Sequence, residues 1–171
     1  MNELLIHISN TEFKDTVKIR FNNILDGFDS FKNFTIEGNS IENEENNIIE
    51  FIEKVFEENN YEAYVDFYIN KISNKDKERL LSLVPDEDKE ILKLHLMPKP
   101  HDGVFYKLNN KNLIPFLVRL NTREIFFVTF YFINKPITIW GNYNLKFPCF
   151  FNDDDDLDFY YNISKSFGFF I

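Results

Sequence analysis

The chain has 171 residues, of which 44% are hydrophobic, and its 28 acidic residues outnumber its 19 basic ones for a formal net charge of −9. This length suits one domain, residues 1–171, with a core that needs neither disulfides nor metal ions, and the negative charge argues against nucleic acid as a partner. Cys149 is the single cysteine, so no internal disulfide can form, and this fits the reducing cytoplasm. The most apolar run, 125–133, is under half of the roughly 20 residues that a membrane helix needs, so we expect no membrane partner.

The beginning of the chain, from Leu4 to Leu25, shows no single period. Val17, Ile19 and Phe21 alternate as they would in a strand, whereas Phe13, Val17 and Phe21 follow helical spacing. Both alternatives stay open, and we favour the helix.

An amphipathic helix is predicted from Glu44 to Glu58. Its apolar side chains gather on one face, while Glu50, Glu53 and Glu57 fall on the opposite one. The apolar set comprises Ile48, Ile49, Phe51, Ile52, Val55 and Phe56. We expect this face to pack on the rest of the protein.

Three further helices are predicted before residue 97. Apolar residues at i, i+3, i+4 and i+7 indicate one over 61–72. A serine or asparagine cap and a proline start then indicate two more, over about 75–84 and 85–96. The first hundred residues are therefore expected to be mainly helical.

Two prolines and a glycine between Met97 and Gly103 end the helical pattern. Short β-branched and aromatic runs separated by turn signals then predict an antiparallel sheet, with strands over 104–108, 116–120, 125–132, 137–140 and 145–151. The run 125–132 is apolar on both faces, which indicates a central strand. The predicted fold class is α+β: a helical N-terminal half packed on an antiparallel sheet (about residues 104–151), with a C-terminal helix from Asp153.

Acidic residues are concentrated in one stretch. Ten lie between Ile36 and Asp66 with Lys54 as the one base, so this stretch alone accounts for the net charge of the chain. One interpretation is a solvated helix face; the other is a contact surface, where uncompensated acids repel each other until a basic partner binds. For the second, the candidate partner-binding residues are Glu42, Glu50, Glu53, Glu57, Glu58, Tyr61, Glu62 and Tyr64.

No catalytic or metal-binding motif is recognisable. His7, His95 and His101 lack zinc-like spacing, and the aspartates of 153–158 lack the ligand spacing and central glycine of a calcium loop. Cys149 and His101 form a conceivable nucleophile and base, but a lone cysteine in apolar surroundings is more often a core residue. We therefore expect no enzymatic activity, no cofactor and no metal ion.

Three segments, Ile125-Phe-Phe-Val-Thr-Phe-Tyr-Phe-Ile133, Thr138-Ile-Trp-Gly-Asn-Tyr143 and Lys146-Phe-Pro-Cys-Phe-Phe151, resemble the sheet region of small bacterial immunity proteins from contact-dependent-inhibition and related polymorphic toxin systems. The resemblance implies a cytoplasmic, non-enzymatic protein that binds and neutralises one cognate toxin domain, commonly a basic nuclease. Two alternatives stay open: a phage anti-defence protein that mimics DNA, and a small α+β enzyme without a recognisable motif.

Overall fold

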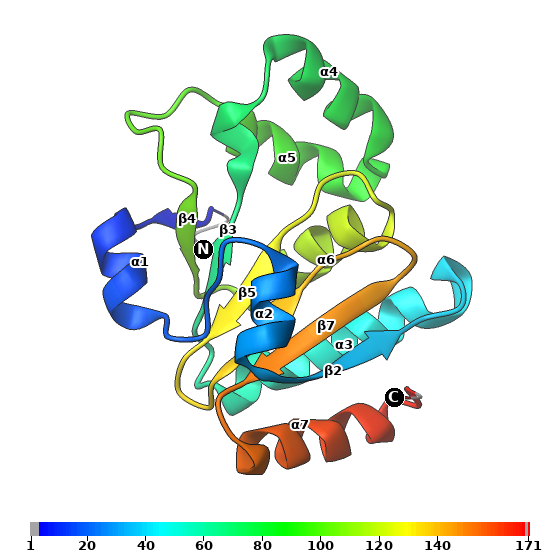
Figure 1. The fold of residues 1–171 in the computed structure, drawn as a ribbon. Helices are drawn as coiled ribbons and strands as arrows, with labels where there is room; N and C mark the ends of the chain where they lie inside the picture. The colour runs from blue at the N-terminus through cyan, green and yellow to red at the C-terminus, as the bar shows by residue number, and fades with distance from the viewer. Residues whose placement is uncertain (1–3, 170) are drawn as a thin grey trace.

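The structure, a computed structural model, describes residues 4–169 and residue 171 (Figure 1). The α-helices are α1 (Asn10–Thr16), α2 (Ile24–Ser30), α3 (Ile41–Glu58), α4 (Asn74–Leu83), α5 (Lys89–Leu96), α6 (Ile114–Thr122) and α7 (Asp154–Ser166). Short 3₁₀ helices are η1 (Tyr68–Lys71), η2 (Asp86–Asp88) and η3 (Lys111–Leu113). The strands are β1 (Ile6–His7), β2 (Lys32–Glu37), β3 (Ala63–Asp66), β4 (Phe105–Leu108), β5 (Thr129–Phe132), β6 (Ile137–Trp140) and β7 (Lys146–Phe151). The predicted α+β class is confirmed.

The strands form one antiparallel sheet in the order β1-β4-β3-β5-β6-β7-β2. β5 lies at its centre, and all four of its residues are buried, so the predicted central strand is confirmed in position. It is shorter than the predicted 125–132, because the side-chain amide of Asn121 holds both the N–H and the carbonyl of Val128 and keeps that residue out of the strand ladder.

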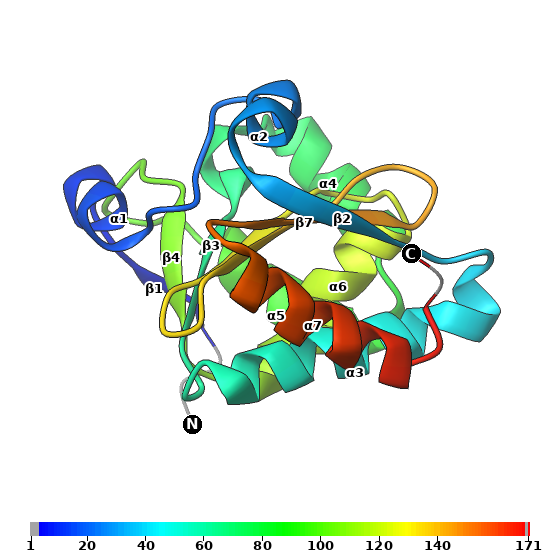
Figure 2. The same ribbon diagram turned by 60° about the horizontal axis from the view of Figure 1, so that its bottom comes forward.

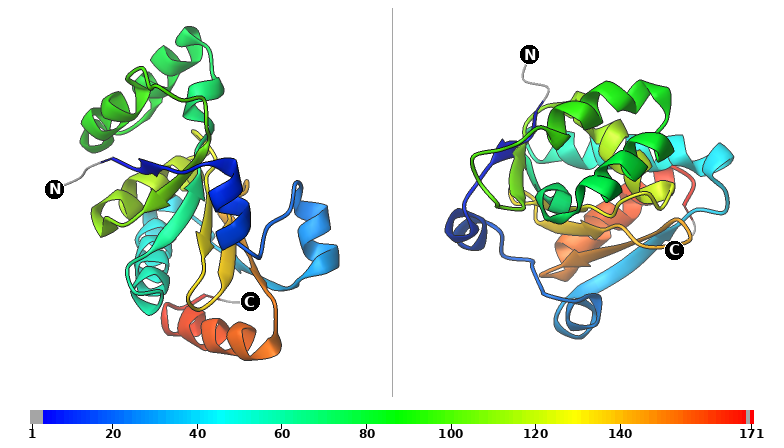
Figure 3. Two further views of the ribbon diagram at one scale, coloured as in Figure 1. Left: turned by 90° about the vertical axis from the view of Figure 1, so that its left-hand side faces the viewer. Right: turned by 90° about the horizontal axis from the view of Figure 1, so that it is seen from above.

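The two faces of the sheet are covered unequally. α3, α6 and α7 pack on one face, whereas α1, α2 and the segment between them lie on the other (Figures 1 and 3). The main cluster of buried apolar side chains lies beneath α3, α6 and α7. A smaller cluster that includes Phe13, Tyr64 and Tyr131 lies on the opposite face. Along β3 and β5, alternate residues join one cluster or the other, as the pleat of a strand dictates.

α3 forms where the amphipathic pattern predicted it. Ser40 caps its start by accepting the N–H of Asn43, and the Glu44 carboxylate accepts the N–H of Ser40, so a second backbone donor at this helix end is satisfied. All six predicted apolar side chains of this helix are at most 8% exposed. The predicted helices over 75–84 and 85–96 correspond to α4 and to η2 with α5, and Asp153 caps α7.

The predicted helix over 61–72 is wrong, because the chain there forms β3 and η1. Asn60 and Tyr61 adopt positive φ values of 58° and 60°, which end α3 and reverse the chain. Residues 63–65 then enter the sheet between β4 and β5, where both faces of a strand are buried. An apolar run buried on both faces has no two-residue alternation, so its spacing was mistaken for that of a helix.

The predicted strand over 116–120 is also wrong, because these residues belong to α6. Pro115 occupies the first turn, where its lack of an N–H costs nothing. The helix is surrounded by core on most sides, so its apolar residues form a continuous run and not a stripe.

The sheet also extends well beyond the predicted range 104–151. β1, β2 and β3 all come from the N-terminal half, and β2 pairs along its whole length with β7. The helix favoured for 4–25 is replaced by β1, α1 and the start of α2. Among the described residues, no helix combines the length and the apolar character needed to cross a membrane.

The buried side chain of Asn59 joins three elements at the end of α3. Its Oδ1 accepts the N–H of Lys135 at 2.8 Å, and its Nδ2 donates to the hydroxyl of Tyr160 at 2.8 Å and to the carbonyl of Val55 at 2.9 Å. The Tyr160 hydroxyl in turn donates to the Lys135 carbonyl at 2.8 Å. This network fixes α3 and α7 to the β5–β6 turn.

We predict that Asn59→Ala lowers the free energy of unfolding by about 3 kcal/mol, because it leaves buried donors and acceptors without partners. Urea denaturation followed by circular dichroism measures the change. Asn46→Ala, on the exposed side of the same helix, is the control and should change stability by less than about 0.5 kcal/mol. Equal losses for both variants would show that the network is not a specific support.

Candidate functional site

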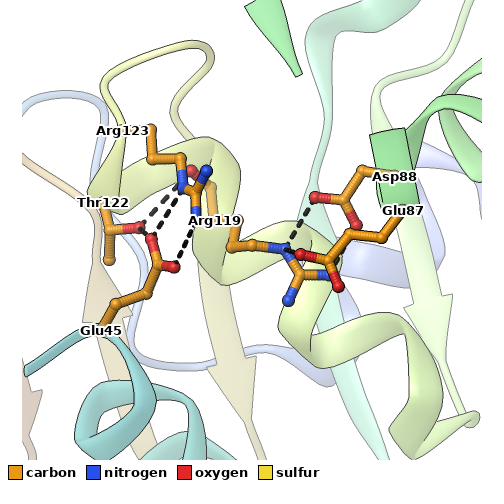
Figure 4. A network of polar contacts seen from close by, with 6 residues as sticks. All are labelled: Glu45, Glu87, Asp88, Arg119, Thr122 and Arg123. Carbon is orange, nitrogen blue, oxygen red and sulfur yellow. Dashed lines mark hydrogen bonds and ion pairs between the residues drawn. The ribbon is translucent and has the colours of Figure 1, made fainter. Parts of the chain in front are cut away.

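The predicted acidic surface lies on the outer side of α3, but the fold compensates much of its charge. Glu45 is buried and is not part of this surface. It is 8% exposed and accepts hydrogen bonds from Arg123 at 2.7 and 3.0 Å and from the Thr122 hydroxyl at 2.6 Å (Figure 4). Burial by itself would raise the pKa of Glu45, but these hydrogen bonds outweigh it and hold the pKa below its usual range. Glu45 therefore anchors α3 to α6 and does not face a partner.

Arg119, one turn before Arg123, makes a matching pair with a different partner. Arg119 donates two hydrogen bonds, of 2.7 and 2.6 Å, to the carboxylate of Asp88, which is 1% exposed (Figure 4). Glu87 lies at 3.7 Å from the same guanidinium. Bidentate pairing fixes geometry as well as charge. α6 is thus tied to α3 by Arg123 and to η2 by Arg119.

Lysines pair with the acids at the C-terminal end of α3. Lys111 from η3 lies 3.3 Å from Glu53 and 2.8 Å from Glu57, and its hydrogen bond lowers the pKa of Glu57. Lys54 pairs with Glu58 at 2.7 Å. We expected the acids of this face to repel each other without a base among them. This expectation is wrong for Glu53 and Glu57, because Lys111, distant in sequence, lies between them. It is also wrong for Glu58, because Lys54 pairs with it.

Glu62 and Tyr64 lie away from the outer side of α3. Glu62 pairs with Lys107 of β4 at 3.0 Å and accepts a hydrogen bond from the Tyr64 hydroxyl at 3.1 Å. Tyr64 itself is 5% exposed and belongs to the small cluster on the sheet face that carries α1. A buried ring cannot anchor a partner, so the assignment of Tyr64 as a contact residue does not hold in this structure.

Glu42, Glu50 and Tyr61 are exposed. Neither carboxylate forms an ion pair within the described residues, and Tyr61 is 57% exposed, with its ring against Phe56. α7 adds further charge that the α3-centred prediction left out. Asp153, Asp154 and Asp155 are exposed at its first turn. α3 and α7 lie side by side in the outer layer (Figure 2).

The acids of α3 and α7 meet around Tyr160. Burial raises the pKa of this tyrosine, and the nearby charges of Asp156 and Glu58 raise it further. Beside Tyr160, the Nζ of Lys135 lies 3.5 Å from the ring centre of Phe159. We define the acidic surface as the exposed and half-buried carboxylates of these two helices: Glu42, Glu50, Glu53, Glu57, Glu58, Asp153, Asp154, Asp155, Asp156 and Asp158.

Asp66, the last acid of the predicted stretch, is not on this surface. It ends β3 on the opposite sheet face, where its carboxylate accepts the N–H of Thr129 at 2.7 Å and the hydroxyl of Tyr131 at 3.2 Å. Burial raises the pKa of Asp66 to about 6, although both hydrogen bonds act to lower it. No cation pairs with it among the described residues.

Cys149 and His101 do not form a catalytic pair. Cys149 is fully buried in β7, where burial raises the pKa of its thiol, and its Sγ contacts the carbonyl of Phe147. His101 stacks on His7 at 3.6 Å, beside β4, and three strands separate β4 from β7. In the part of the chain that the structure describes, no three His, Cys, Asp or Glu side chains are grouped to hold a metal ion.

We predict that Asp66→Asn changes the pH dependence of stability. The pKa of about 6 in the folded state exceeds the value of 3.8 expected for the unfolded chain, so the fold binds this proton more tightly. The protonated Asp66 therefore adds to the free energy of unfolding, and this contribution is complete below pH 3.8 and is lost as the pH rises through 6. Relative to the wild type, the variant should therefore gain up to about 3 kcal/mol between pH 4 and pH 7.

Urea denaturation at several pH values measures this difference. Asp29→Asn, at an exposed position of α2, is the control for the same chemical change. A constant difference between Asp66→Asn and wild type across this range would show that Asp66 is solvated.

Comparisons with known proteins identify no relative. No protein-family model matches the chain, and neither the curated proteins nor the solved structures contain a significant match.

Proposed function

We propose that this protein is an immunity protein that binds one bacterial toxin domain with a basic surface, such as a nuclease, and blocks it in the cytoplasm. The observation that carries the proposal is the acidic surface of α3 and α7. It brings together two acid-rich segments that are about 100 residues apart in sequence and lie in one layer (Figure 2). The resemblance of the strand segments to immunity proteins points the same way.

The lysines within the surface support a role in specific binding. Lys111 and Lys54 fix the carboxylates of Glu53, Glu57 and Glu58 in defined positions. Fixed side chains lose less conformational freedom when a partner binds. Glu42 and Glu50 form no ion pair with the residues that the structure describes, so they supply the net charge that would attract a basic domain, and the exposed ring of Tyr61 supplies an apolar contact.

The same lysines count against the alternative of a DNA mimic. Duplex DNA presents an uninterrupted series of phosphate charges, roughly one per 1.7 Å of helix axis. Here Lys54 and Lys111 interrupt the series of carboxylates on α3. A protein partner, which meets a mixed pattern of charges, fits this surface better.

We predict that changing four acids of the surface to amides slows association with the toxin. The variant is Glu42→Gln, Glu50→Gln, Asp155→Asn and Asp158→Asn, four exposed carboxylates without an ion pair in the described residues. Its association rate should fall about tenfold or more at low salt and approach the wild-type rate at high salt, because screening removes the long-range attraction. Stopped-flow mixing with the cognate toxin domain, to be sought among the genes beside this one, measures the rate.

The control has the same composition and net charge but lies elsewhere: Glu12→Gln, Glu78→Gln, Asp15→Asn and Asp29→Asn, all exposed. It should associate within about twofold of the wild-type rate, because its acids lie outside the contact surface. If both variants associate equally slowly, the attraction depends on the net charge of the chain and not on this surface. If the chain neither binds the domain nor protects cells that express it, the proposed function is wrong.

A further inference from the structure

A cavity of about 660 Å³ lies on the sheet face opposite to the acidic surface. Its floor is formed by β3, β4, β5 and β6, and its walls are α1, α2 and the segment between them, which arch over this face (Figure 3). The hydroxyl of Thr138 donates to the Ile19 carbonyl at 2.6 Å and ties that segment to the sheet. The volume is within the range of sites that enclose small molecules.

Aromatic rings line the cavity and are held by their own contacts. Phe13 of α1 stacks on Phe105 of β4 at 3.8 Å and meets Tyr131 of β5 edge-on at 5.0 Å. Across the cavity, Phe21 stacks on Trp140 of β6 at 5.3 Å. Because each ring packs on another, the walls are formed before any ligand enters. Ring faces carry negative electrostatic potential and attract cations.

Asp66 brings a carboxylate to this aromatic lining. The Thr129 N–H and the Tyr131 hydroxyl hold its orientation. Other charged or titratable groups that line the cavity are Lys14 of α1, Arg20, Asp26 of α2, Tyr68 of η1 and Tyr131 of β5. Arg20 is directed to the Val17 carbonyl at 3.0 Å, and Asp26 accepts a hydrogen bond from Asn23 at 2.6 Å.

The absence of a cation at Asp66 contrasts with five other buried or half-buried carboxylates. Glu45 and Asp88 each have an arginine, and Glu53, Glu57 and Glu62 each have a lysine. Within the described residues Asp66 has neither. Asp66 is half-buried, and keeping its charge in these surroundings without an ion pair costs stability above pH 6, an arrangement that more often serves a function than stability.

We propose that this cavity binds a small organic cation, a primary ammonium or guanidinium group on an aromatic or apolar body, with Asp66 as its counter-ion. The cation meets the carboxylate and the faces of the surrounding rings, and the apolar body fills the rest of the cavity between Phe13 and Trp140. The site is independent of the acidic surface and of the proposed toxin partner.

Phenethylamine is a suitable probe, because it joins a primary ammonium group to a phenyl ring. Trp140 lines the cavity and is the single tryptophan of the chain, so its fluorescence reports binding there. We expect saturable binding at pH 7.5 with a change in fluorescence, confirmed by calorimetry. N-acetylphenethylamine has no charge, and phenylacetate has the opposite charge. Both should bind at least about tenfold more weakly.

Two variants and a change of pH test the role of Asp66. Asp66→Asn should weaken phenethylamine binding at least about tenfold, whereas Asp26→Asn in the same cavity should stay within about twofold. Lowering the pH from 7.5 to 5 should weaken wild-type binding about tenfold, because most of the Asp66 carboxylate becomes protonated. The pH effect should disappear in Asp66→Asn. Circular dichroism checks that each variant is folded.

The comparison of probes on the wild-type chain keeps the test decisive even if a variant does not fold. Equal binding of phenethylamine and its N-acetyl form would overturn the proposal, because charge would then play no part. Tighter binding of phenylacetate would assign the cavity to anions held by Lys14 and Arg20. No binding of phenethylamine or of phenethylguanidine up to about 10 mM would equally contradict a cation site.

Discussion

Pairing between the acids of one segment and the cations of another is the interaction on which the helical layer depends. The acid-rich stretch 37–66 contains one base, Lys54, which pairs with Glu58, and the other cations that compensate it, Lys107, Lys111, Arg123 and Lys146, come from beyond residue 100. The Glu45 pair matters most, because its carboxylate is buried and would be costly to leave without a partner. The more exposed lysine pairs contribute little to stability and mainly set where the carboxylates point.

This compensation divides the acids into three groups with different roles. Glu45 and Asp88 hold α6 between α3 and η2 (Figure 4). The exposed acids of α3 and α7 form a surface that we assign to a protein partner. Asp66 stands apart, because it is directed to a cavity on the opposite face and has no cation within the described residues. The unequal covering of the sheet produces this division: long helices seal one face, and two short ones leave space on the other.

How much of this the sequence predicted depends on where each element lies. Amphipathic α3 and the capped α4 and α7 were predicted well, because one side of each meets solvent and the pattern shows it. β3 and α6 were mistaken for each other's class, because burial on all sides removes the period that separates strand from helix. β2 was missed because it pairs with β7, more than 100 residues away, and local propensity does not report such pairing.

The two candidate sites also differ in how far the sequence predicted them. The acid content of 37–66 identified the α3 surface, but its pairing with Lys111 depends on a contact between residues more than 50 apart. From the sequence, Asp66 cannot be distinguished from the surface acids. Only the register of β3 beside β5 brings its carboxylate to Thr129 and Tyr131. No local pattern signals that a half-buried carboxylate will lack a cation.

A titration of the carboxylates followed by carbon-13 NMR tests this account of charge compensation most directly, because one experiment reports each acid separately. We expect Glu45 and Glu57 to titrate below the usual range of a glutamate, and Asp66 to titrate near pH 6. Ordinary pKa values for both glutamates, with Asp66 titrating near pH 4 as a solvated aspartate does, would contradict both the pairing of the glutamates and the desolvation of Asp66.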